Sequence, residues 1–297
     1  MEQTKNYAVF IASHIRYEGQ LKLLLNAIKS VKNQDYKEGS IDIWLSISFD
    51  NCDFKDEFDA LNIADDCFKC FIQEHRMYQL EHLKVLNDNS YNDYKYELIL
   101  FLDDDDEYAT NRITKFDEIL KDIYDFDKGI YRQTQVLWED AKALTDNNEV
   151  ISCFIYWTFG VKQESFNAFF HLFKQRHLQH NLADMLLKMY FERLLFLNDE
   201  AVVDNGLYMY NTNNSHSISA LKSSVEKKGN SGVYLMTCMY DSKYMKNKFG
   251  NKFKSKIDND LWRVCYEIFH KFKTPEEFFD NLAVIINRNH KKKLKLV

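Results

Sequence analysis

A short apolar run that ends in a block of acids places the strongest constraint on how this chain can fold. The stretch Glu97–Tyr108 reads ELILFLDDDDEY, in which Leu98 to Leu102 are apolar and four aspartates follow without a break. An apolar run of this length is typical of a strand buried on both faces, as in a parallel sheet. The acids then lie at the carboxyl end of that strand, which is the edge where open α/β sheets bind ligands.

The acidic block, Asp103 to Asp106, carries like charges in close proximity. Their mutual repulsion destabilises the fold unless a positive group lies beside them. A divalent cation is the first candidate, because hard cations take carboxylate oxygens as ligands. The alternative is a solvated acidic turn that follows a strand and binds nothing.

Composition and charge narrow the class of protein. The chain has 297 residues, a net charge of −6 and a pI of about 5.9, which argues against a basic surface that binds nucleic acid. No stretch approaches the roughly 18 apolar residues that a membrane span needs, and the first ten residues do not resemble a signal peptide. We therefore expect a soluble, cytoplasmic protein with no nucleic-acid partner and no transmembrane segment.

Strand-like and helix-like segments alternate in the first third of the chain. Short runs of β-forming residues predict strands, and apolar residues at helical spacing predict helices. The predicted strands are Tyr7–Ser13, Ile41–Phe49, Cys67–Ile72 and Leu98–Leu102, and the predicted helices are 18–33, 54–62 and 75–87. This order predicts a parallel, doubly wound sheet. Further on, 111–124, 164–174 and 181–197 are predicted helices, 129–138 and 206–211 are predicted strands, and 151–161 is a strand or buried loop.

Four pieces of the sequence, taken in order, resemble the nucleotide-binding half of family 2 glycosyltransferases with the GT-A fold. They are YAVFIASHIR, LLNAIKSVKNQ, IDIWLSISFDN and YELILFLDDDDEY. The second piece matches the family's A-I-x-S-V-x-x-Q pattern from Ala27 to Gln34, and the last matches L-D-x-D-D from Leu102 to Asp106. The resemblance is good over residues 7–112, weaker as far as 219, and absent beyond.

The resemblance implies the organisation of the chain. Residues 1–219 would form a GT-A glycosyltransferase domain, with a nucleotide-binding half over 1–112 and an acceptor half over 113–219. Residues 220–297 are mostly helical in pattern and would form a helical C-terminal extension packed on that domain; no Gly-, Pro- or Ser-rich linker separates them. The expected fold class is α/β, a Rossmann-like, mostly parallel central sheet flanked by helices.

The resemblance also implies an activity. It is the inverting, metal-dependent transfer of a hexosyl or N-acetylhexosaminyl group from a UDP- or dTDP-sugar to a hydroxyl of a glycan or similar acceptor. Mn²⁺ or Mg²⁺ suits an oxygen-rich site and can neutralise a diphosphate leaving group. The alternative is a non-catalytic nucleotide- or metal-binding module of the same fold. A nucleotidyltransferase is disfavoured, because the loop SHIRYEG after the first strand contains a single glycine.

Within the acidic block, the resemblance assigns Asp105 to the metal and Asp103 or Asp104 to the ribose or sugar of the nucleotide. Two acids one residue apart on an extended segment point to the same side, so Asp103 and Asp105 can serve one site. Because the four aspartates are consecutive, the register is open by one residue and Asp106 is the alternative metal ligand.

Other candidate nucleotide contacts follow the first two strands. Asp50 ends the second strand, where its carboxylate can accept the imide N–H of uracil or thymine; the alternative is a turn that it forms with Asn51. Ser13 and Arg16 lie where the first strand leaves the sheet, a position from which family members contact the nucleotide. Arg16 can pair with a phosphate or simply lie on the surface.

Sugar transfer by direct displacement needs a base that takes the proton of the acceptor hydroxyl. In the family this base is an acid at the start of a later helix, often in an E-D pair. Asp184 takes that position here, with Ala183 in place of the first acid. The alternative is structural, since Asn181 can cap the helix with Asp184 three residues on. Glu164 and Asp140 are further candidates for the base.

The family often ends this half with Y-R-x-H-x-x-S-x-S, and Leu207 to Ser219 is similar. Asn211 replaces the arginine, and His216 comes three residues late. His216 is a candidate metal or phosphate ligand, or a loop histidine without a role. The other histidines, His14 and His82 among them, show no metal-ligand spacing, and we expect them to be structural or exposed.

Overall fold

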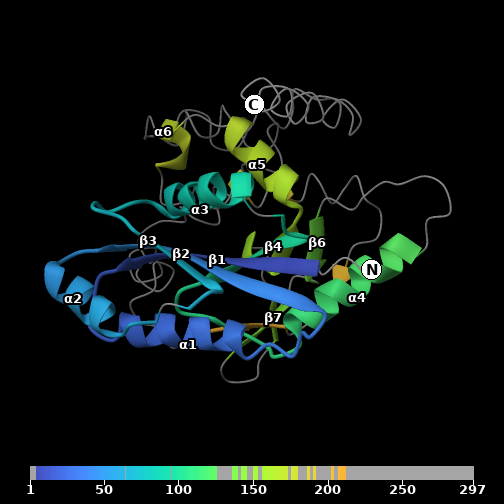
Figure 1. The fold of residues 1–297 in the computed structure, drawn as a ribbon, viewed down its shortest axis with the longest axis horizontal. Helices are drawn as coiled ribbons and strands as arrows, with labels where there is room; N and C mark the ends of the chain where they lie inside the picture. Colours follow the sequence, from blue (N-terminus) through green and yellow to red (C-terminus); the bar gives the residue numbers. More distant parts are fainter. Residues whose placement is uncertain are drawn as a thin grey trace, which may run out of the picture. The chain divides into compact units, whose positions relative to one another are not determined.

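The structure is a computed structural model, drawn as a ribbon in Figure 1. It describes residues 5–63, 65–93, 95–125, 136–139, 142–145, 150–152, 156–172, 175–179, 186–187, 190–191, 202–203 and 207–211. The chain forms two compact units, Met1–Thr212 and Asn213–Val297, and all the described residues belong to the first. The helical extension expected from residue 220 onward, and the boundary after residue 219, therefore remain predictions.

A seven-stranded sheet forms the centre of the first unit, with the strand order β10-β6-β9-β4-β1-β2-β3. β1 pairs in parallel with β2 and β4, and β2 pairs in parallel with β3, whereas β9 is antiparallel to β4 and β6. The strands are β1 (Lys5–Ile15), β2 (Gly39–Phe49), β3 (Phe68–Ile72), β4 (Leu98–Asp103), β6 (Val136–Glu139), β9 (Phe159–Val161) and β10 (Val202–Val203). The predicted α/β class with a mostly parallel sheet is confirmed.

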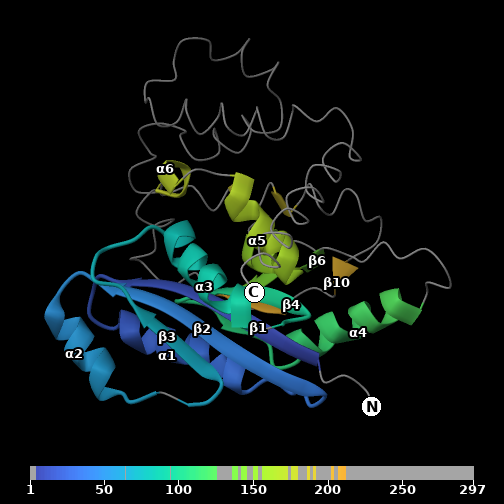
Figure 2. The same ribbon diagram turned by 45° about the horizontal axis from the view of Figure 1, so that its top comes forward.

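Helices cover both faces of this sheet. In Figures 1 and 2, α1 lies on one face, and α3 and α5 lie on the other. The helices are α1 (Gln20–Lys32), α2 (Cys52–Ala60), α3 (Gln79–Asp93), α4 (Arg112–Asp125), α5 (Gln163–Leu172) and α6 (Gln175–Leu178). Apolar residues of α1 such as Leu24 and Ile28 are buried while its lysines are outside, as the helical spacing predicts.

A second sheet, with the strand order β5-β11-β7-β8, lies beyond the acidic block. Its strands are β5 (Glu107–Tyr108), β11 (Tyr208–Tyr210), β7 (Lys142–Thr145) and β8 (Val150–Ser152). The antiparallel pairing of β5 with β11 brings residues from the end of the first unit beside the acids. The segment 151–161 was expected as one strand or loop. It instead contributes to β8 of the second sheet and contains β9 of the central sheet, with the 3₁₀ turn Tyr156–Thr158 before β9.

The apolar run of β4 is buried on both faces, as predicted. Leu98 to Phe101 are fully buried and Leu102 is 1% exposed. On the face covered by α3 and α5, Phe101 packs edge-on against Phe10 of β1 and lies 5.1 Å, between ring centroids, from Phe166 of α5. Aromatic pairs at such distances stabilise the folded state beyond the contribution of their buried apolar area.

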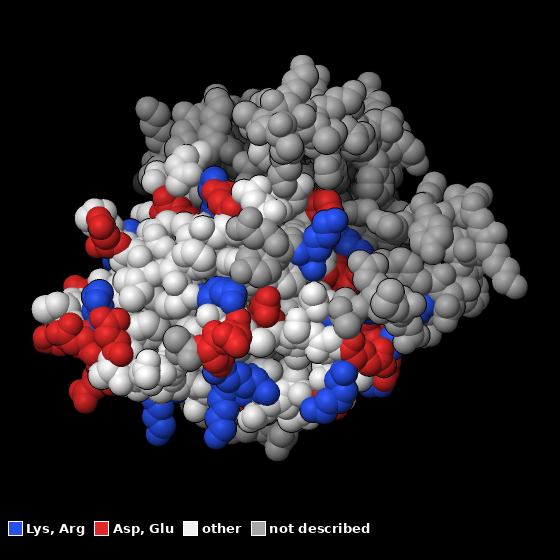
Figure 3. Space-filling view, viewed as in Figure 1, with Lys and Arg blue, Asp and Glu red and all other residues white. Residues whose placement is uncertain are grey.

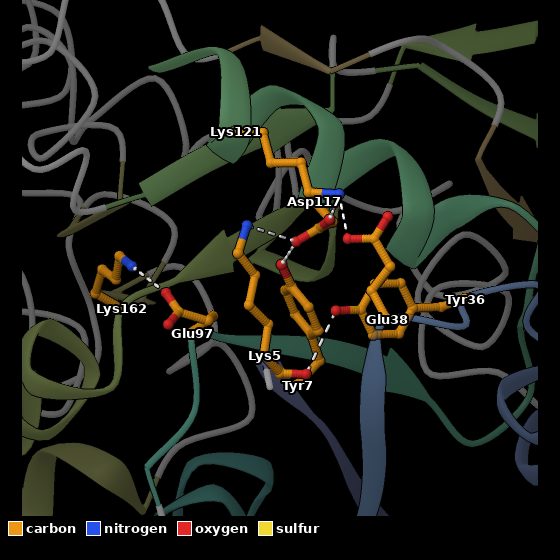
Figure 4. A network of polar contacts seen from close by, with 8 residues as sticks. All are labelled: Lys5, Tyr7, Tyr36, Glu38, Glu97, Asp117, Lys121 and Lys162. Carbon is orange, nitrogen blue, oxygen red and sulfur yellow. Dashed lines mark hydrogen bonds and ion pairs between the residues drawn. The ribbon is translucent and has the colours of Figure 1, made fainter. Parts of the chain in front are cut away.

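A polar network links α4 to the amino edge of the sheet, by which we mean the end where the parallel strands begin (Figure 4). Asp117 of α4 is buried, and it accepts hydrogen bonds from Tyr7 Oη at 2.6 Å and Lys5 Nζ at 3.1 Å. Lys121 Nζ lies 2.9 Å from its other oxygen and also pairs with Glu38. Burial by itself would raise the pKa of Asp117, but these hydrogen bonds outweigh burial and lower the pKa.

The surface of the described residues carries both signs of charge. On the face in Figure 3, acidic side chains gather where α2 lies, and Lys and Arg side chains elsewhere are interspersed with acids. The acids of α2 are Asp53, Asp56, Glu57 and Asp59. Among the helices that the structure describes, none is both long enough and apolar enough to cross a bilayer.

Candidate functional site

Three parallel strands end at one edge of the central sheet and bring the predicted site residues together. β1 lies between β2 and β4, so the carboxyl ends of all three are adjacent. Ser13 lies near the end of β1, Asp50 directly follows β2, and Asp103 ends β4. This edge is the one at which open α/β sheets bind ligands, so the structure places the candidates from three separate segments at one site.

The acidic block forms a turn. The backbone N–H of Asp106 donates to the carbonyl oxygen of Asp103 at 3.3 Å, and residues 104 and 105 lie in the turn. The expectation that Asp103 and Asp105 point to the same side assumed an extended backbone, and this assumption is wrong because the chain turns directly after β4. Each aspartate therefore has its own direction and its own partners.

Asp104 points to β1. Its Oδ2 atom accepts hydrogen bonds from Ser13 Oγ at 2.5 Å and from Gln20 Nε2 at 3.0 Å. Burial, and secondly the charge of Asp105, raise the pKa of Asp104 to about 7; the two hydrogen bonds and the charge of Arg16 act in the opposite direction. At neutral pH this carboxyl is therefore near the midpoint of its titration.

Arg16 lies in the connection between β1 and α1. Its backbone N–H donates to Gln20 Oε1 at 3.0 Å, and Gln20 Nε2 donates to the carbonyl oxygen of His14 at 3.1 Å. The guanidinium group lowers the pKa of Asp104, so a positive charge lies near the acids. Contact between Arg16 and a phosphate remains a prediction.

Asp103 points toward α3 and the 3₁₀ turn. Its Oδ1 atom accepts hydrogen bonds from Tyr156 Oη at 2.5 Å and from Gln79 Nε2 at 3.0 Å. Gln79 Nε2 also lies 2.8 Å from Tyr156 Oη. These contacts hold the last residue of β4 to the first residue of α3, which fixes the side chain at the edge of the site.

Asp106 points away from solvent and is 1% exposed. Tyr208 Oη donates to its Oδ2 atom and the backbone N–H of Asn211 donates to its Oδ1 atom, both at 2.8 Å. Burial raises the pKa of Asp106 well above its ordinary value, and the charges of Asp105 and Asp103 add to this effect. Because both carboxylate oxygens already accept hydrogen bonds, Asp105 is the more accessible of the two candidate metal ligands.

The carboxylates at this edge form a candidate site for a divalent cation. Within the described part of the chain, no group of three or more His, Cys, Asp or Glu side chains is arranged to hold a metal ion. Mg²⁺ and similar ions need only one or two carboxylates where phosphate oxygens and waters complete their coordination. Asp105 is partly exposed, and its charge raises the pKa of both Asp104 and Asp106. A cation bound there would relieve this repulsion, so the residues fit.

The remaining candidates are not among the described residues that meet at this edge. Asp184, Asp140 and His216 are outside the described residues, so their roles remain predictions. Glu164 is exposed at the start of α5, and its neighbour Lys162 pairs at 3.0 Å with Glu97, just before β4 begins. Glu164 therefore lies at the amino edge of the sheet, opposite Asp103, and is wrong as a candidate for the base.

The sequence did not reveal the residues that orient the acids. Gln20, Gln79, Tyr156 and Tyr208 all contact the acidic block. The first three belong to no motif, and Tyr208 lies in the stretch Leu207 to Ser219 but was not a candidate there. His14, expected to be structural or exposed, lies with Nε2 at 2.8 Å from Asp50 Oδ1. One signal was present, since Ser46, Ser48 and Asp50 alternate along a strand that is otherwise apolar there.

Comparison with known proteins supports the fold. No protein-family model matches the chain, and no curated protein matches its sequence. The crystal structure of S. aureus TarS residues 1–349 in complex with UDP matches with a TM-score of 0.52 and 10% identity, covering 97% of this chain and 92% of that one. The complex of the same protein with UDP-GlcNAc matches with a TM-score of 0.51, 9% identity and the same coverage. At this identity the likeness concerns the fold alone, and it confirms the predicted GT-A fold class.

Proposed function

We propose that this protein is a glycosyltransferase that takes a sugar from a UDP- or dTDP-sugar and attaches it to a hydroxyl group of a glycan or similar acceptor. The observation that carries the proposal is the contact of Ser13 on β1 with Asp104 after β4, beside Asp50 at the end of β2. The solved protein of the same fold binds UDP and UDP-GlcNAc. Its ligands make a nucleotide sugar the first choice for this edge.

The residues of the site have separate tasks in this proposal. Asp50 accepts the imide N–H of the pyrimidine base. Arg16 supplies positive charge to the diphosphate, and a planar guanidinium group suits phosphate oxygens. Asp103 and Asp104 accept hydroxyl groups of the ribose or the sugar, in directions set by Tyr156 and Ser13.

Mn²⁺ or Mg²⁺ would be held by Asp105, with Asp106 and His216 as the other proposed ligands. When bound, the ion would supply positive charge to the diphosphate as the bond to the sugar breaks. Burial, and secondly the charge of Asp105, raises the pKa of both Asp104 and Asp106. A cation at this position would offset the charge of Asp105, and this supports the proposal.

Transfer would proceed by one displacement with inversion at the anomeric carbon. Asp184 is the proposed base, and its carboxylate would take the proton of the acceptor hydroxyl as that oxygen attacks. The acceptor would enter from the half of the domain that follows residue 113.

The first experiment is thermal unfolding of the full chain with UDP, Mn²⁺ or both. UDP with Mn²⁺ should raise the melting temperature, because a ligand that binds only the folded state stabilises it, and EDTA should remove the effect. UDP release from UDP-GlcNAc or another UDP-sugar, lost in Asp105→Ala but kept in Asp56→Ala on the exposed face of α2, would support the transferase. Stabilisation by Ca²⁺ alone, without any effect of nucleotide, would instead indicate a non-catalytic module.

A further inference from the structure

A chain of hydrogen bonds connects Asp50 with the interior of the domain on the face covered by α3. His14 Nε2 lies 2.8 Å from Asp50 Oδ1, and His14 Nδ1 lies 2.8 Å from Ser48 Oγ. Ser48 Oγ in turn lies 3.1 Å from His82 Nε2. Each of these groups therefore contacts the next, and the chain continues beyond His82.

The inner end of the chain lies between β2, α3 and the segment after β3. His82 Nδ1 is 2.8 Å from Ser46 Oγ, and Gln73 Nε2 donates to the same oxygen at 3.2 Å. His82 is 1% exposed, and the side chains of Ser46 and Ser48 are completely buried. The Asp50 side chain is 43% exposed, so this chain of hydrogen bonds runs from the buried interior to the accessible edge of the site.

Strand geometry explains why these residues meet. Ser46, Ser48 and Asp50 are two residues apart on or just after β2, so their side chains share one face of the sheet. His14 of β1 is paired with Ser48 in the parallel register. His82 lies on α3, which covers this face.

The direction of the hydrogen bonds can be worked out from the Asp50 end. A carboxylate only accepts, so His14 Nε2 donates, and Nδ1 of the neutral ring must then accept from Ser48 Oγ. A serine has one hydroxyl proton, so His82 Nε2 must donate to Ser48. The other nitrogen of His82 then accepts the proton of Ser46, which leaves Ser46 able only to accept from a further donor.

The inner end is consistent with this direction. Gln73 Nε2 also donates to the carbonyl oxygen of Phe71 at 3.2 Å. A carbonyl oxygen only accepts, so the atom that faces both Phe71 and Ser46 must be the amide nitrogen. Gln73 is therefore the donor that Ser46 requires, and every hydrogen bond in the chain points toward Asp50.

The environment of both rings favours the neutral state that this direction requires. Burial, and secondly the charge of His14, lower the pKa of His82 to about 3. Burial also lowers the pKa of His14; Asp50 opposes this effect, and the nearby Arg76 and Arg16 reinforce it. Both imidazoles are thus neutral at pH 7.

We propose that His14 is a positioning residue that holds Asp50 for recognition of a uracil or thymine base. Its Nε2–H group occupies Oδ1, and among the described residues no hydrogen bond reaches Oδ2. Oδ2 can then accept the imide N–H of the base. Cytosine has an acceptor at the same ring position, so a carboxylate fixed in this way discriminates against it. This inference rests on the proposed function, because it requires a nucleotide at this edge.

The test is calorimetric titration of the full chain with UDP and with CDP in the presence of Mn²⁺. His14→Gln keeps an amide nitrogen near the position of Nε2, whereas the shorter side chain in His14→Asn reaches only the position of Nδ1. We expect the Asn variant to bind UDP about three- to tenfold more weakly, with CDP binding unchanged. The Gln variant should keep most of the preference for UDP.

A double-mutant cycle separates positioning from a general structural role. If His14 acts through Asp50, the effect of His14→Asn on UDP binding should disappear in an Asp50→Ala background. Should His14→Asn fail to fold, as judged by thermal unfolding, Ser48→Ala tests the same chain one step further inward and should also reduce the preference for UDP.

The outcomes are distinct. Equal loss of UDP and CDP binding in the His14 variants, or effects that add to those of Asp50→Ala, would overturn the positioning role while leaving the transferase standing. A wild-type protein that binds UDP and CDP equally would overturn the selectivity. A wild-type protein that binds neither nucleotide would overturn the proposed function, and this inference with it.

Discussion

The pKa values of aspartates shift in opposite directions at the two ends of the central sheet. At the amino edge, Asp117 is held by Tyr7, Lys5 and Lys121, and its pKa is lowered. At the carboxyl edge, the donors that reach Asp104 and Asp106 are hydroxyl, amide and backbone N–H groups, and both pKa values are raised. The same side-chain type is thus stabilised in its charged form by lysines at one end, whereas at the other end burial and the charges of neighbouring aspartates outweigh the groups that lower its pKa.

This difference separates a structural site from a binding site. A buried carboxylate that has cationic partners is stable where it is, and its removal is costly because the buried groups around it lose their hydrogen-bond partner. Acids with raised pKa values at a ligand-binding edge are typical of functional sites. We therefore expect substitutions at the amino edge to change stability, and substitutions at the carboxyl edge to change ligand binding.

The largest effect is expected for Asp117→Ala. It leaves the buried Tyr7 Oη and two partly exposed lysines without their partner, and the free energy of unfolding should fall by about 3 kcal/mol. Urea denaturation measures this change. The control is Asp88→Ala, which removes an exposed aspartate paired with Lys84 on α3. An equal loss of stability there would contradict the claim that the Asp117 network stabilises the fold more than an exposed ion pair.

Asp105→Ala should leave the fold intact but reduce UDP-sugar turnover about a hundredfold, comparable to the removal of one electrostatic contact in an active site. The measurement is kcat/KM for UDP release. Unfolding in urea should show the same or higher stability, because the repulsion on Asp104 and Asp106 decreases. Full activity in this variant would show that Asp105 is not a metal ligand.

Asp104→Asn should stabilise the ligand-free protein, and only at higher pH. The folded-state pKa is raised from 3.8 to about 7, so the unfolded state loses this proton first and stability falls as pH rises between these values. An amide oxygen can still accept from Ser13 and Gln20. The gain should be near zero below pH 4 and roughly 1–2 kcal/mol at pH 8. A gain independent of pH would contradict this assignment.

The smallest effect is expected at the outer part of the amino-edge network. Glu38 pairs with Lys121, and both side chains are exposed by more than a third. Glu38→Gln should therefore lower the free energy of unfolding by about 0.2–1 kcal/mol, and 1 M NaCl should abolish the difference because exposed pairs are screened. A loss as large as that in Asp117→Ala would show that the outer pair carries the network.

The sequence predicted the parts of the fold that depend on local pattern. The apolar run Leu98–Leu102 predicted a strand buried on both faces, and the helical spacing in α1 predicted which of its sides is buried. The resemblance to family 2 glycosyltransferases implied that Ser13, Asp50 and Asp103 serve one site, and the parallel order of the predicted strands agreed with this, because parallel strands place their carboxyl ends together. These inferences required no knowledge of individual side-chain contacts.

The remaining contacts depend on pairs far apart in the chain. Tyr208 reaches Asp106 across 102 residues, and Tyr156 reaches Asp103 across 53. Such partners leave no spacing signal, because the pairing of β5 with β11 and the position of the 3₁₀ turn bring them together. The sequence left a turn after the strand open as an alternative, because four identical residues carry no pattern that distinguishes a turn from an extended segment.

Ser13 and His14 are consecutive residues of β1 whose side chains leave opposite faces of the sheet, one toward Asp104 and the other toward Asp50. The two acids, which follow β4 and β2, are therefore each hydrogen-bonded to one of two consecutive residues of the same strand. If a nucleotide sugar spans them, the distance that it must bridge is set by the spacing of two residues in one strand. Thermal motion of the surrounding loops could then change how fast the ligand enters, but not the size of the molecule that fits.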